Sequence, residues 1–319
     1  MLTIMIAITL ISSVVSMYLA LNYTCTDIKT CKNEKIHVLN TSEFIDSDFE
    51  KTYQGLKNKI GNFDMKIYNP PLSSESTEQK DWNRIVRDIN KVYKDYDAFV
   101  IVGTSDSIPY IASALAFMLE NLGKPVVLTD KNLSQTLVTA SQTTIPEVMV
   151  FEDGKLLRGC RTTLDFSKFV SPRYDNLTKN NSIDKPSEPL QIKNVNPSNK
   201  ISVIQVFPGI TPDYVRSFLN VKGLQGLVIE TWKNGKISSR DEILKAVTEL
   251  AKKGIVIVAL SPHTDIDMRL LESGALPGYD MTRECAYAKL AFLLGNVEDK
   301  KLIGKLMDIS FRGEMTNNA

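Results

Sequence analysis

The chain has 319 residues, of which 43% are apolar and 24% are charged, and its formal net charge is +1. A chain of this length and apolar content can bury two separate cores, so we expect two globular domains. Because the net charge is close to zero, the composition indicates no basic surface that would bind nucleic acid, and we expect no nucleic-acid partner.

The chain opens with an apolar stretch that carries no charge, Leu2–Leu21. About 20 apolar residues are long enough to span a bilayer, and a signal-peptide core is normally shorter. Small residues such as Ser16 and Ala20 would suit a cleavage site. A cleaved signal peptide and an uncleaved membrane anchor both stay open for residues 1–24, and either one targets the chain to the secretory pathway. We expect membrane contact only through residues 2–21.

Acceptor triplets and cysteines favour the same compartment. The Asn-x-Ser/Thr triplets that accept N-linked glycans occur at Asn22, Asn40, Asn132, Asn176 and Asn180. Four cysteines permit three pairings, and Cys25 with Cys31 is the simplest pairing because the two lie close together. With two histidines and no Cys-x-x-Cys spacing, we expect no metal site. The sequence therefore predicts a glycoprotein, secreted or membrane-anchored, whose globular part is lumenal or extracellular.

Strands and helices alternate along the first half of the chain. We expect the first strand at Ile36–Leu39. Apolar residues spaced three and four apart predict an amphipathic helix from Trp82 to Tyr96. A buried strand (Ala98–Val102), a helix (Ile108–Leu122) and a further strand (Val126–Leu128) follow. This alternation predicts a parallel sheet.

A polar segment divides the chain after a predicted hairpin at Asp153-Gly154. From about Tyr174 to Lys200 the sequence is rich in Pro, Asn and Ser, which indicates a linker. We place the two domains at residues 25–190 and 191–319. The alternation then resumes, with strands at Val203–Phe207, Gly226–Glu230 and Ile255–Leu260 and a helix at Thr282–Leu294. The predicted fold class is therefore α/β, with a parallel sheet in each domain.

Residues 99–130 are the most informative stretch of the chain. A buried strand passes through Gly103–Ser107 into a helix, so Ser105 and Asp106 lie at the carboxyl end of that strand. In open α/β sheets, ligands bind at this edge. Ser107 suits the helix N-cap and Pro109 its first turn. We expect Ser105 and Asp106 to belong to a binding or catalytic site.

This stretch resembles the second signature of the L-asparaginase family, HGTDTMxYTASALSFML followed by GKPVV. Ser105-Asp106 stand where the family has its catalytic Thr-Asp pair. The resemblance covers about residues 36–316. Ser73 to Trp82 is similar to the family's substrate loop DSSxxxxxxDW, and three later segments are similar to its RGNRTT, DMTxEA and RGELT motifs (residues 148–163, 280–284 and 312–316). These later motifs are typical of the cytosolic bacterial, type I branch.

The resemblance implies a two-domain asparaginase-like fold, with a larger N-terminal flavodoxin-like domain and a smaller C-terminal Rossmann-like domain. It implies no cofactor and a small amino-acid ligand, L-asparagine or similar. It also implies a homodimer, because active sites in the family are completed across two subunits. Ser74, Ser105 and Asp106 are the residues that it places at the ligand.

Other family residues have been lost. The family's nucleophile lies in a TGGTIG motif, and the corresponding residues here put Phe44, which has no hydroxyl, at the nucleophile position. Ser42 and Glu43 replace the glycines that allow a sharp turn there. The family's lysine position is Leu164. Because losing a nucleophile costs many orders of magnitude in rate, the sequence predicts a catalytically inactive pseudoenzyme with a binding or structural role, in which Ser105 and Asp106 are vestigial.

An active amidohydrolase with a rebuilt site, which would release ammonia from L-asparagine, is the alternative. In it, Ser105 or Thr41 would be the nucleophile and Asp106 would bind the substrate. The sequence indicates no base beside Ser105, and a hydroxyl there is typical of the turn before a helix. Lys168 is a candidate substitute for the lost lysine, although a surface lysine is the more common case.

Overall fold

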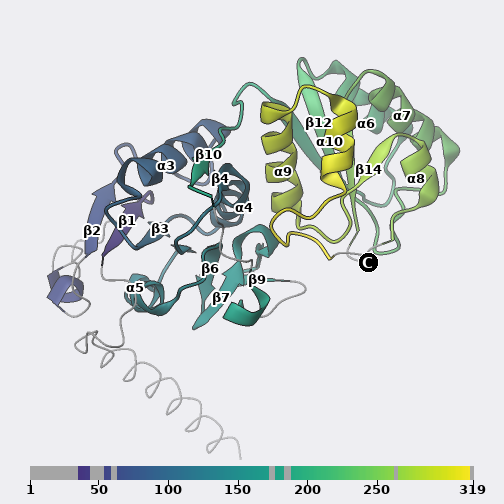
Figure 1. Cartoon of the computed structure of the whole chain (residues 1–319). Coiled ribbons are helices and arrows are strands. Elements are labelled where there is room, and N and C mark those ends of the chain that lie inside the picture. Colours follow the sequence, from purple (N-terminus) through teal and green to yellow (C-terminus); the bar gives the residue numbers. More distant parts are fainter. Residues whose placement is uncertain are drawn as a thin grey trace, which may run out of the picture.

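The computed structural model describes residues 35–43, 54–58, 63–171, 177–182, 188–261 and 265–316. Two main sheets, with helices packed against them, form two neighbouring halves (Figure 1). The predicted fold class is confirmed. The predicted signal or anchor at residues 2–21, the pair Cys25 and Cys31, and Phe44 lie outside the described residues. Within the described ranges, no helix is long and apolar enough to cross a membrane.

The N-terminal half is built on a six-stranded sheet of order β2-β1-β3-β5-β6-β7. Its strands are β1 (Ile36–Asn40), β2 (Phe63–Ile67), β3 (Ala98–Val102), β5 (Val126–Thr129), β6 (Val148–Glu152) and β7 (Lys155–Arg158). All neighbours are parallel except the β6–β7 hairpin. The central strands β1, β3, β5 and β6 are buried along nearly their whole length. This burial on both faces explains their almost unbroken apolar sequences.

Parallel pairing aligns the carboxyl ends of β1, β3 and β5. Asn40 is paired with Val102, and Val102 is paired with Thr129. Residues that follow these strands therefore emerge together at one edge of the sheet. The sequence predicted a ligand site at this edge.

The helices α3 (Gln79–Val92), α4 (Ile108–Met118) and α5 (Leu133–Gln142) connect these strands. Almost every residue of α4 is buried, which explains its lack of a polar face. The predicted end of this helix at Leu122 is wrong. After Met118 the chain forms the short strand β4 (Leu119–Glu120), which pairs with β10 (Gln191–Ile192). Asn121 then turns the chain away with a positive φ of 59°.

Short elements follow β7. They are the 3-10 helices η1 (Gly159–Arg161) and η2 (Lys179–Asn181) and the hairpin of β8 (Thr163–Asp165) and β9 (Lys168–Val170). η1 matters for the contact between the two halves, because it places Cys160 and Arg161 in the interior.

The C-terminal half has a four-stranded parallel sheet of order β11-β12-β13-β14. Its strands are β11 (Lys200–Gln205), β12 (Leu224–Glu230), β13 (Val256–Leu260) and β14 (Ala275–Pro277). Its helices are α6 (Pro212–Ser217), η3 (Phe218–Asn220), α7 (Asp241–Lys252), α8 (Met268–Glu272), α9 (Arg283–Asn296) and α10 (Lys300–Met307). The smaller parallel sheet is the one that the sequence predicted.

The helices α4 and α9 join the two halves (Figure 1). One buried hydrophobic cluster contains residues of both helices, including Leu115 on α4 and Leu290 on α9. The rings of Phe117 and Phe292 stack with their centroids 6.0 Å apart. The contact between the halves is thus an apolar core that both share.

Candidate functional site

The loops after three parallel strands meet at one edge of the N-terminal sheet. The amide of Thr41 donates to the carbonyl of Val102 (2.8 Å), and the amide of Gly103 donates to the carbonyl of Thr129 (3.0 Å). These two bonds extend the sheet beyond the ends of β1 and β3. We call the polar residues gathered here the strand-end site, which consists of Thr41, Ser74, Thr104–Ser107 and Asp130.

Ser105 forms a short hydrogen bond within the strand-end site. Its hydroxyl donates to Oδ2 of Asp130, the residue that follows β5, at 2.6 Å. The other oxygen of Asp130, Oδ1, is buried and has no hydrogen-bond partner among the described residues. A carboxylate that accepts a serine proton has the geometry of a general base. The sequence analysis missed this carboxylate; its signal was an acidic residue directly after the next strand of the same sheet.

Ser74 is connected to the same loop through a chain of hydroxyl groups. Ser74 Oγ donates to Thr104 Oγ1 at 2.7 Å, and Thr104 Oγ1 lies 2.7 Å from Ser107 Oγ. Ser107 Oγ donates in turn to the Thr104 carbonyl (3.0 Å). Ser107 is the N-cap residue of α4, as the sequence predicted, but its side chain forms no capping hydrogen bond. The structure therefore brings the predicted ligand residue Ser74 to the loop of Ser105 and Asp106.

Asp106 has different surroundings from Ser105. Its side chain is exposed, whereas Ser105 is half-buried. The structure shows no hydrogen bond or ion pair of the Asp106 carboxylate with any other described residue. The carboxylate is thus free to meet a cation from solution.

Thr41 and Ser42 retain hydroxyls that are committed to the backbone and to a neighbour. Thr41 Oγ1 donates to the Val102 carbonyl at 2.8 Å, and Thr41 is 1% exposed. Both the amide and the hydroxyl of Ser42 donate to Asn40 Oδ1 (3.1 and 2.9 Å). Because Asn40 is buried, it does not offer its side chain to a glycan in the folded chain.

Two lysines near this edge are engaged elsewhere. Lys168 pairs with Asp153 at 3.2 Å, and both side chains are exposed, as expected for a surface lysine. Lys131, beside Asp130, donates to the Ser167 carbonyl at 3.3 Å. Leu164, at the position of the family's lysine, packs half-buried against the main core.

Arg161, in the segment that resembles RGNRTT, joins the two halves of the molecule. Arg161 is 1% exposed, and its guanidinium donates to Asp280 at 2.9 Å. The amide and hydroxyl of Thr316 also donate to Asp280 (2.8 and 2.5 Å). Burial raises the pKa of Asp280, but the bonds from Thr316 and the charge of Arg161 outweigh it, and the pKa is lowered. Three motifs thus meet in one structural network.

A second buried ion pair fixes the C-terminal segment to α9. Lys289 Nζ lies 2.8 Å from Glu314, and both side chains are fully buried. The same ammonium donates to the carbonyls of Met307 (3.1 Å) and Ile309 (2.6 Å). Burial by itself raises the pKa of Glu314, but the charge and hydrogen bond of Lys289 outweigh this effect. The pKa of Glu314 is therefore lowered.

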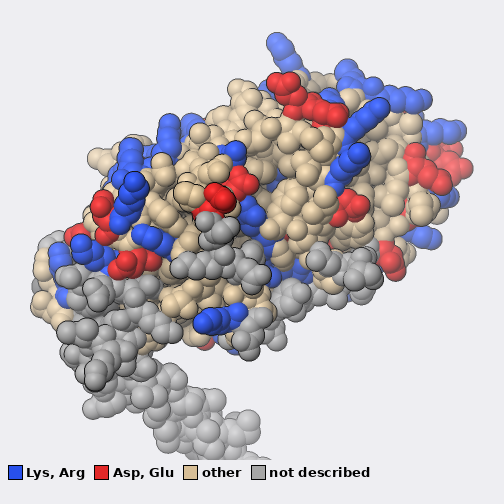
Figure 2. Space-filling view, in the orientation of Figure 1, with Lys and Arg blue, Asp and Glu red and all other residues tan. Residues whose placement is uncertain are grey.

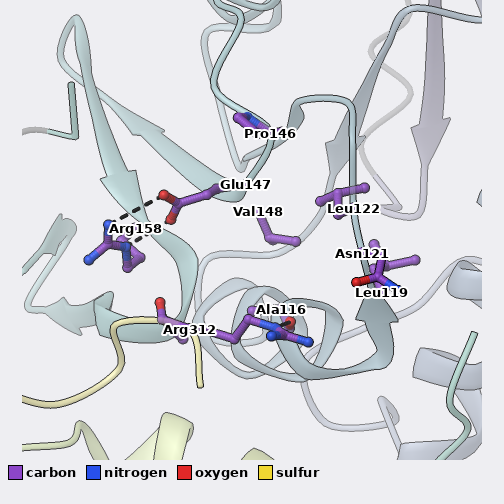
Figure 3. A pocket seen from close by; sticks show the side chains of 10 residues that line it. Ala116, Leu119, Asn121, Leu122, Pro146, Glu147, Val148, Arg158 and Arg312 are labelled. Carbon is purple, nitrogen blue, oxygen red and sulfur yellow. Dashed lines mark hydrogen bonds and ion pairs between the residues drawn. The ribbon is translucent and has the colours of Figure 1, made fainter. Parts of the chain in front are cut away.

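A separate cavity of about 150 Å³ lies at the opposite edge of the N-terminal sheet (Figure 3). Its wall contains the bidentate pair of Arg158 with Glu147, at 2.8 and 3.3 Å. Arg312 lies across from this pair and donates to the Ala116 carbonyl in the last turn of α4 (2.9 Å). The charges of Arg158 and Arg312 are therefore compensated by a carboxylate and by a helix C-terminus.

Charges of both signs are interspersed over the face drawn in Figure 2. In the described part of the chain, no group of three His, Cys, Asp or Glu side chains has a geometry that could bind a metal ion.

Comparison with known proteins agrees with this geometry. The model of the family described as "Asparaginase, N-terminal" matches residues 27–185, and that of the "Glutaminase/Asparaginase C-terminal domain" matches residues 200–307. The chain is 33% identical to L-asparaginase 1 of Escherichia coli over 293 residues, which cover 81% of this chain and 86% of that protein. It is 32% identical to the 60 kDa lysophospholipase of Mus musculus over 77% of this chain and 50% of that protein.

A solved structure gives the same result. The crystal structure of L-asparaginase I from Vibrio cholerae superposes with a TM-score of 0.80 at 28% identity, over 89% of this chain and 99% of the other. Both halves of the chain, their order and their sheets are therefore matched. The chain belongs to the asparaginase family.

Proposed function

We propose that this chain is a secretory-pathway member of the asparaginase family that binds a small amino acid at the strand-end site without hydrolysing it. The observation that carries the proposal is the state of Thr41, the hydroxyl that remains from the family's nucleophile motif. It is buried and its proton is donated to the Val102 carbonyl. Phe44 and Leu164 supply neither a nucleophile nor an amine.

The exposed carboxylate of Asp106 supports an amino-acid ligand. An ammonium group binds a carboxylate through charge-assisted hydrogen bonds and needs no nucleophile for this. The hydroxyls of Ser74 and Ser105 lie on the same loop system and supply further polar contacts. L-Asparagine, or an amino acid of similar size, fits this chemistry.

The bond between Ser105 and Asp130 favours a second candidate function, an amidohydrolase with a rebuilt site. In this reaction Asp130 takes the proton of Ser105 as the serine oxygen attacks the side-chain amide carbon of asparagine. Protonated Asp130 then gives this proton to the amide nitrogen, the C–N bond breaks and ammonia leaves, and water hydrolyses the resulting serine ester to aspartate and free Ser105. The 2.6 Å separation is short enough for the first proton transfer.

Ammonia release and ligand binding, measured on the same proteins, separate the two functions. The wild type should release no ammonia from L-asparagine above background, while millimolar L-asparagine should raise its thermal midpoint. Asp106→Ala should abolish this rise. Ammonia release that disappears in both Ser105→Ala and Asp130→Asn would establish the second function instead. If the wild type shows no ammonia release and no thermal shift, both functions are contradicted.

Targeting to the secretory pathway is part of the proposal. It is supported by the uncharged stretch at residues 2–21 and by the acceptor Asn132, which is exposed and lies at the start of α5. Expression in a secretory cell should give a protein whose mobility increases after endoglycosidase treatment. An unshifted protein in the cytosol would contradict this part.

We also propose a homodimer, as the resemblance implies. Exposed aromatic side chains lie on two loops of the C-terminal half, Phe207 (42% exposed) after β11 and Trp232 (41%) after β12. Tyr214 packs edge-on against Phe207 with 5.4 Å between ring centroids and is 40% exposed. Sedimentation should give a dimer at micromolar concentration. A strict monomer would contradict this part of the proposal.

A further inference from the structure

Two buried cysteines lie at the contact between the halves of the molecule. Cys160 is on η1, which follows β7 of the N-terminal half, and Cys285 is near the start of α9 of the C-terminal half. Both thiols are free and buried, with 1% and 0% exposure, and both belong to the hydrophobic cluster that joins α4 to α9. η1 packs directly against α9.

The two cysteines lie close together, because η1 packs against α9 and both belong to the same buried cluster. Cys160 Sγ donates its only proton to the carbonyl of Arg312 at 3.3 Å. Burial first, and then the neighbouring Cys160 side chain, raise the pKa of Cys285. Cys160 thus connects η1 to the C-terminal segment, and Cys285 lies beside it on α9.

At both positions the family motif has a residue other than cysteine. Cys160 occupies the asparagine position of RGNRTT, and Cys285 occupies the alanine position of DMTxEA. The two motifs are far apart in the sequence, and the fold brings these two positions close together. A pair of cysteines at facing positions differs from a single buried thiol, because it can be oxidised within one molecule.

We propose that Cys160 and Cys285 form a disulfide that links the two domains covalently when the chain folds in the presence of a disulfide oxidant, such as oxidised glutathione. One thiolate attacks the oxidant, and the second thiolate displaces glutathione from the mixed disulfide. One S–S bond forms in the protein and the S–S bond of one glutathione disulfide breaks, and the two cysteine protons pass to the two glutathione thiolates to give two glutathiones. Because the folded thiols are buried, this exchange takes place before α9 closes over η1.

The bond would act mainly on the unfolded chain. It closes the long loop between residues 160 and 285, and a cross-link across a long loop removes more conformational entropy from the unfolded state than one across a short loop. It would also hold α9 against η1 and so keep Arg161 beside Asp280. The proposal does not depend on catalysis at the strand-end site.

Peptide mapping tests the bond directly. The full chain is refolded in mild detergent with oxidised and reduced glutathione, its free thiols are alkylated, and it is digested with trypsin without reduction. Trypsin cuts after Arg158, Arg161, Arg283 and Lys289. The expected product is the peptide of residues 159–161 joined to that of residues 284–289. Alkylated Cys160 and Cys285, or either one joined to Cys25 or Cys31, would overturn the proposal.

Thermal unfolding provides the matched control. Reductant should lower the midpoint of the oxidised wild type by roughly 5 °C or more. Cys285→Ala, which restores the family residue and keeps Cys25 and Cys31, should show a clearly smaller change. An equal change in both proteins would also overturn the proposal. The peptide map of the wild type decides the question if the variant does not fold.

Discussion

Ser105 and Asp106 are neighbours in the chain, but we expect the Ser105 side chain to stabilise the fold and the Asp106 side chain to contribute little to its stability. Ser105 donates to a carboxylate whose second oxygen is buried without a partner in the described structure, whereas Asp106 is exposed. Ser105→Ala should therefore lower the free energy of unfolding by about 1–3 kcal/mol. Asp106→Ala should change it by less than about 0.5 kcal/mol. Urea unfolding measures both, and equal effects would show that the bond to Asp130 does not stabilise the loop.

For single residues, the sequence predicted the place of a residue in the sheet better than it predicted the hydrogen-bond partner of its side chain. The place of Ser105 and Asp106 at a strand end follows from a short local pattern. The partner of Ser105 is 25 residues away and reaches it only through the parallel register of β3 and β5. Thr41 is a second example, because its hydroxyl is committed to the next strand through the pairing of β1 with β3.

Helix α9 depends on a buried lysine, and this gives a prediction at the scale of an element. Lys289→Met leaves the Glu314 carboxylate buried without its cation and also removes donors from two carbonyls. We expect the free energy of unfolding to fall by about 3–5 kcal/mol. Lys305→Met, on the exposed side of α10, is the matched control and should change it by less than about 0.5 kcal/mol. Guanidinium unfolding compares the two, and similar values would contradict the prediction.

The end of α4 shows why element boundaries were harder to predict than elements. Leu119 and Leu122 are buried, so the apolar pattern continues past the true end of the helix. What ends the helix is the pairing of β4 with β10, a segment that lies beyond much of the polar linker. A pattern confined to one stretch of sequence contains no information about that pairing.

At the scale of the whole molecule, the two parallel sheets were predictable because their strands are apolar runs separated by helices. The contact between the halves was not, since beside the shared apolar core it includes Arg161 and Asp280, polar residues of two family motifs. Lys289 with Glu314 fixes the C-terminal segment next to them. The structure places them in buried networks that fasten the C-terminal segment to both halves. Several motif residues of this chain thus serve the architecture, so a motif can be retained for the fold alone.

Acid should destabilise the molecule in two separate pH ranges. Burial lowers the pKa of His37, so the unfolded chain takes up a proton near pH 6.5 before the folded chain does. The stability that neutral His37 contributes is complete above about pH 6.5 and declines below it. Asp280 and Glu314 have lowered pKa values, so their contribution is complete above their unfolded pKa of about 4 and is lost as the pH falls through the folded values.

Thermal midpoints measured from pH 8 to pH 3 test this assignment. The wild type should show a shallow decline that begins near pH 6.5 and a steep one below about pH 4. His37→Phe keeps a ring near Tyr96, whose centroid lies 4.7 Å from that of His37, and should remove only the shallow decline. Glu314→Gln should lower the midpoint at neutral pH and flatten the steep decline, because the folded state then has one fewer paired carboxylate to protonate. A shallow decline that persists in His37→Phe would assign it to another group, and a wild-type midpoint independent of pH would contradict both assignments.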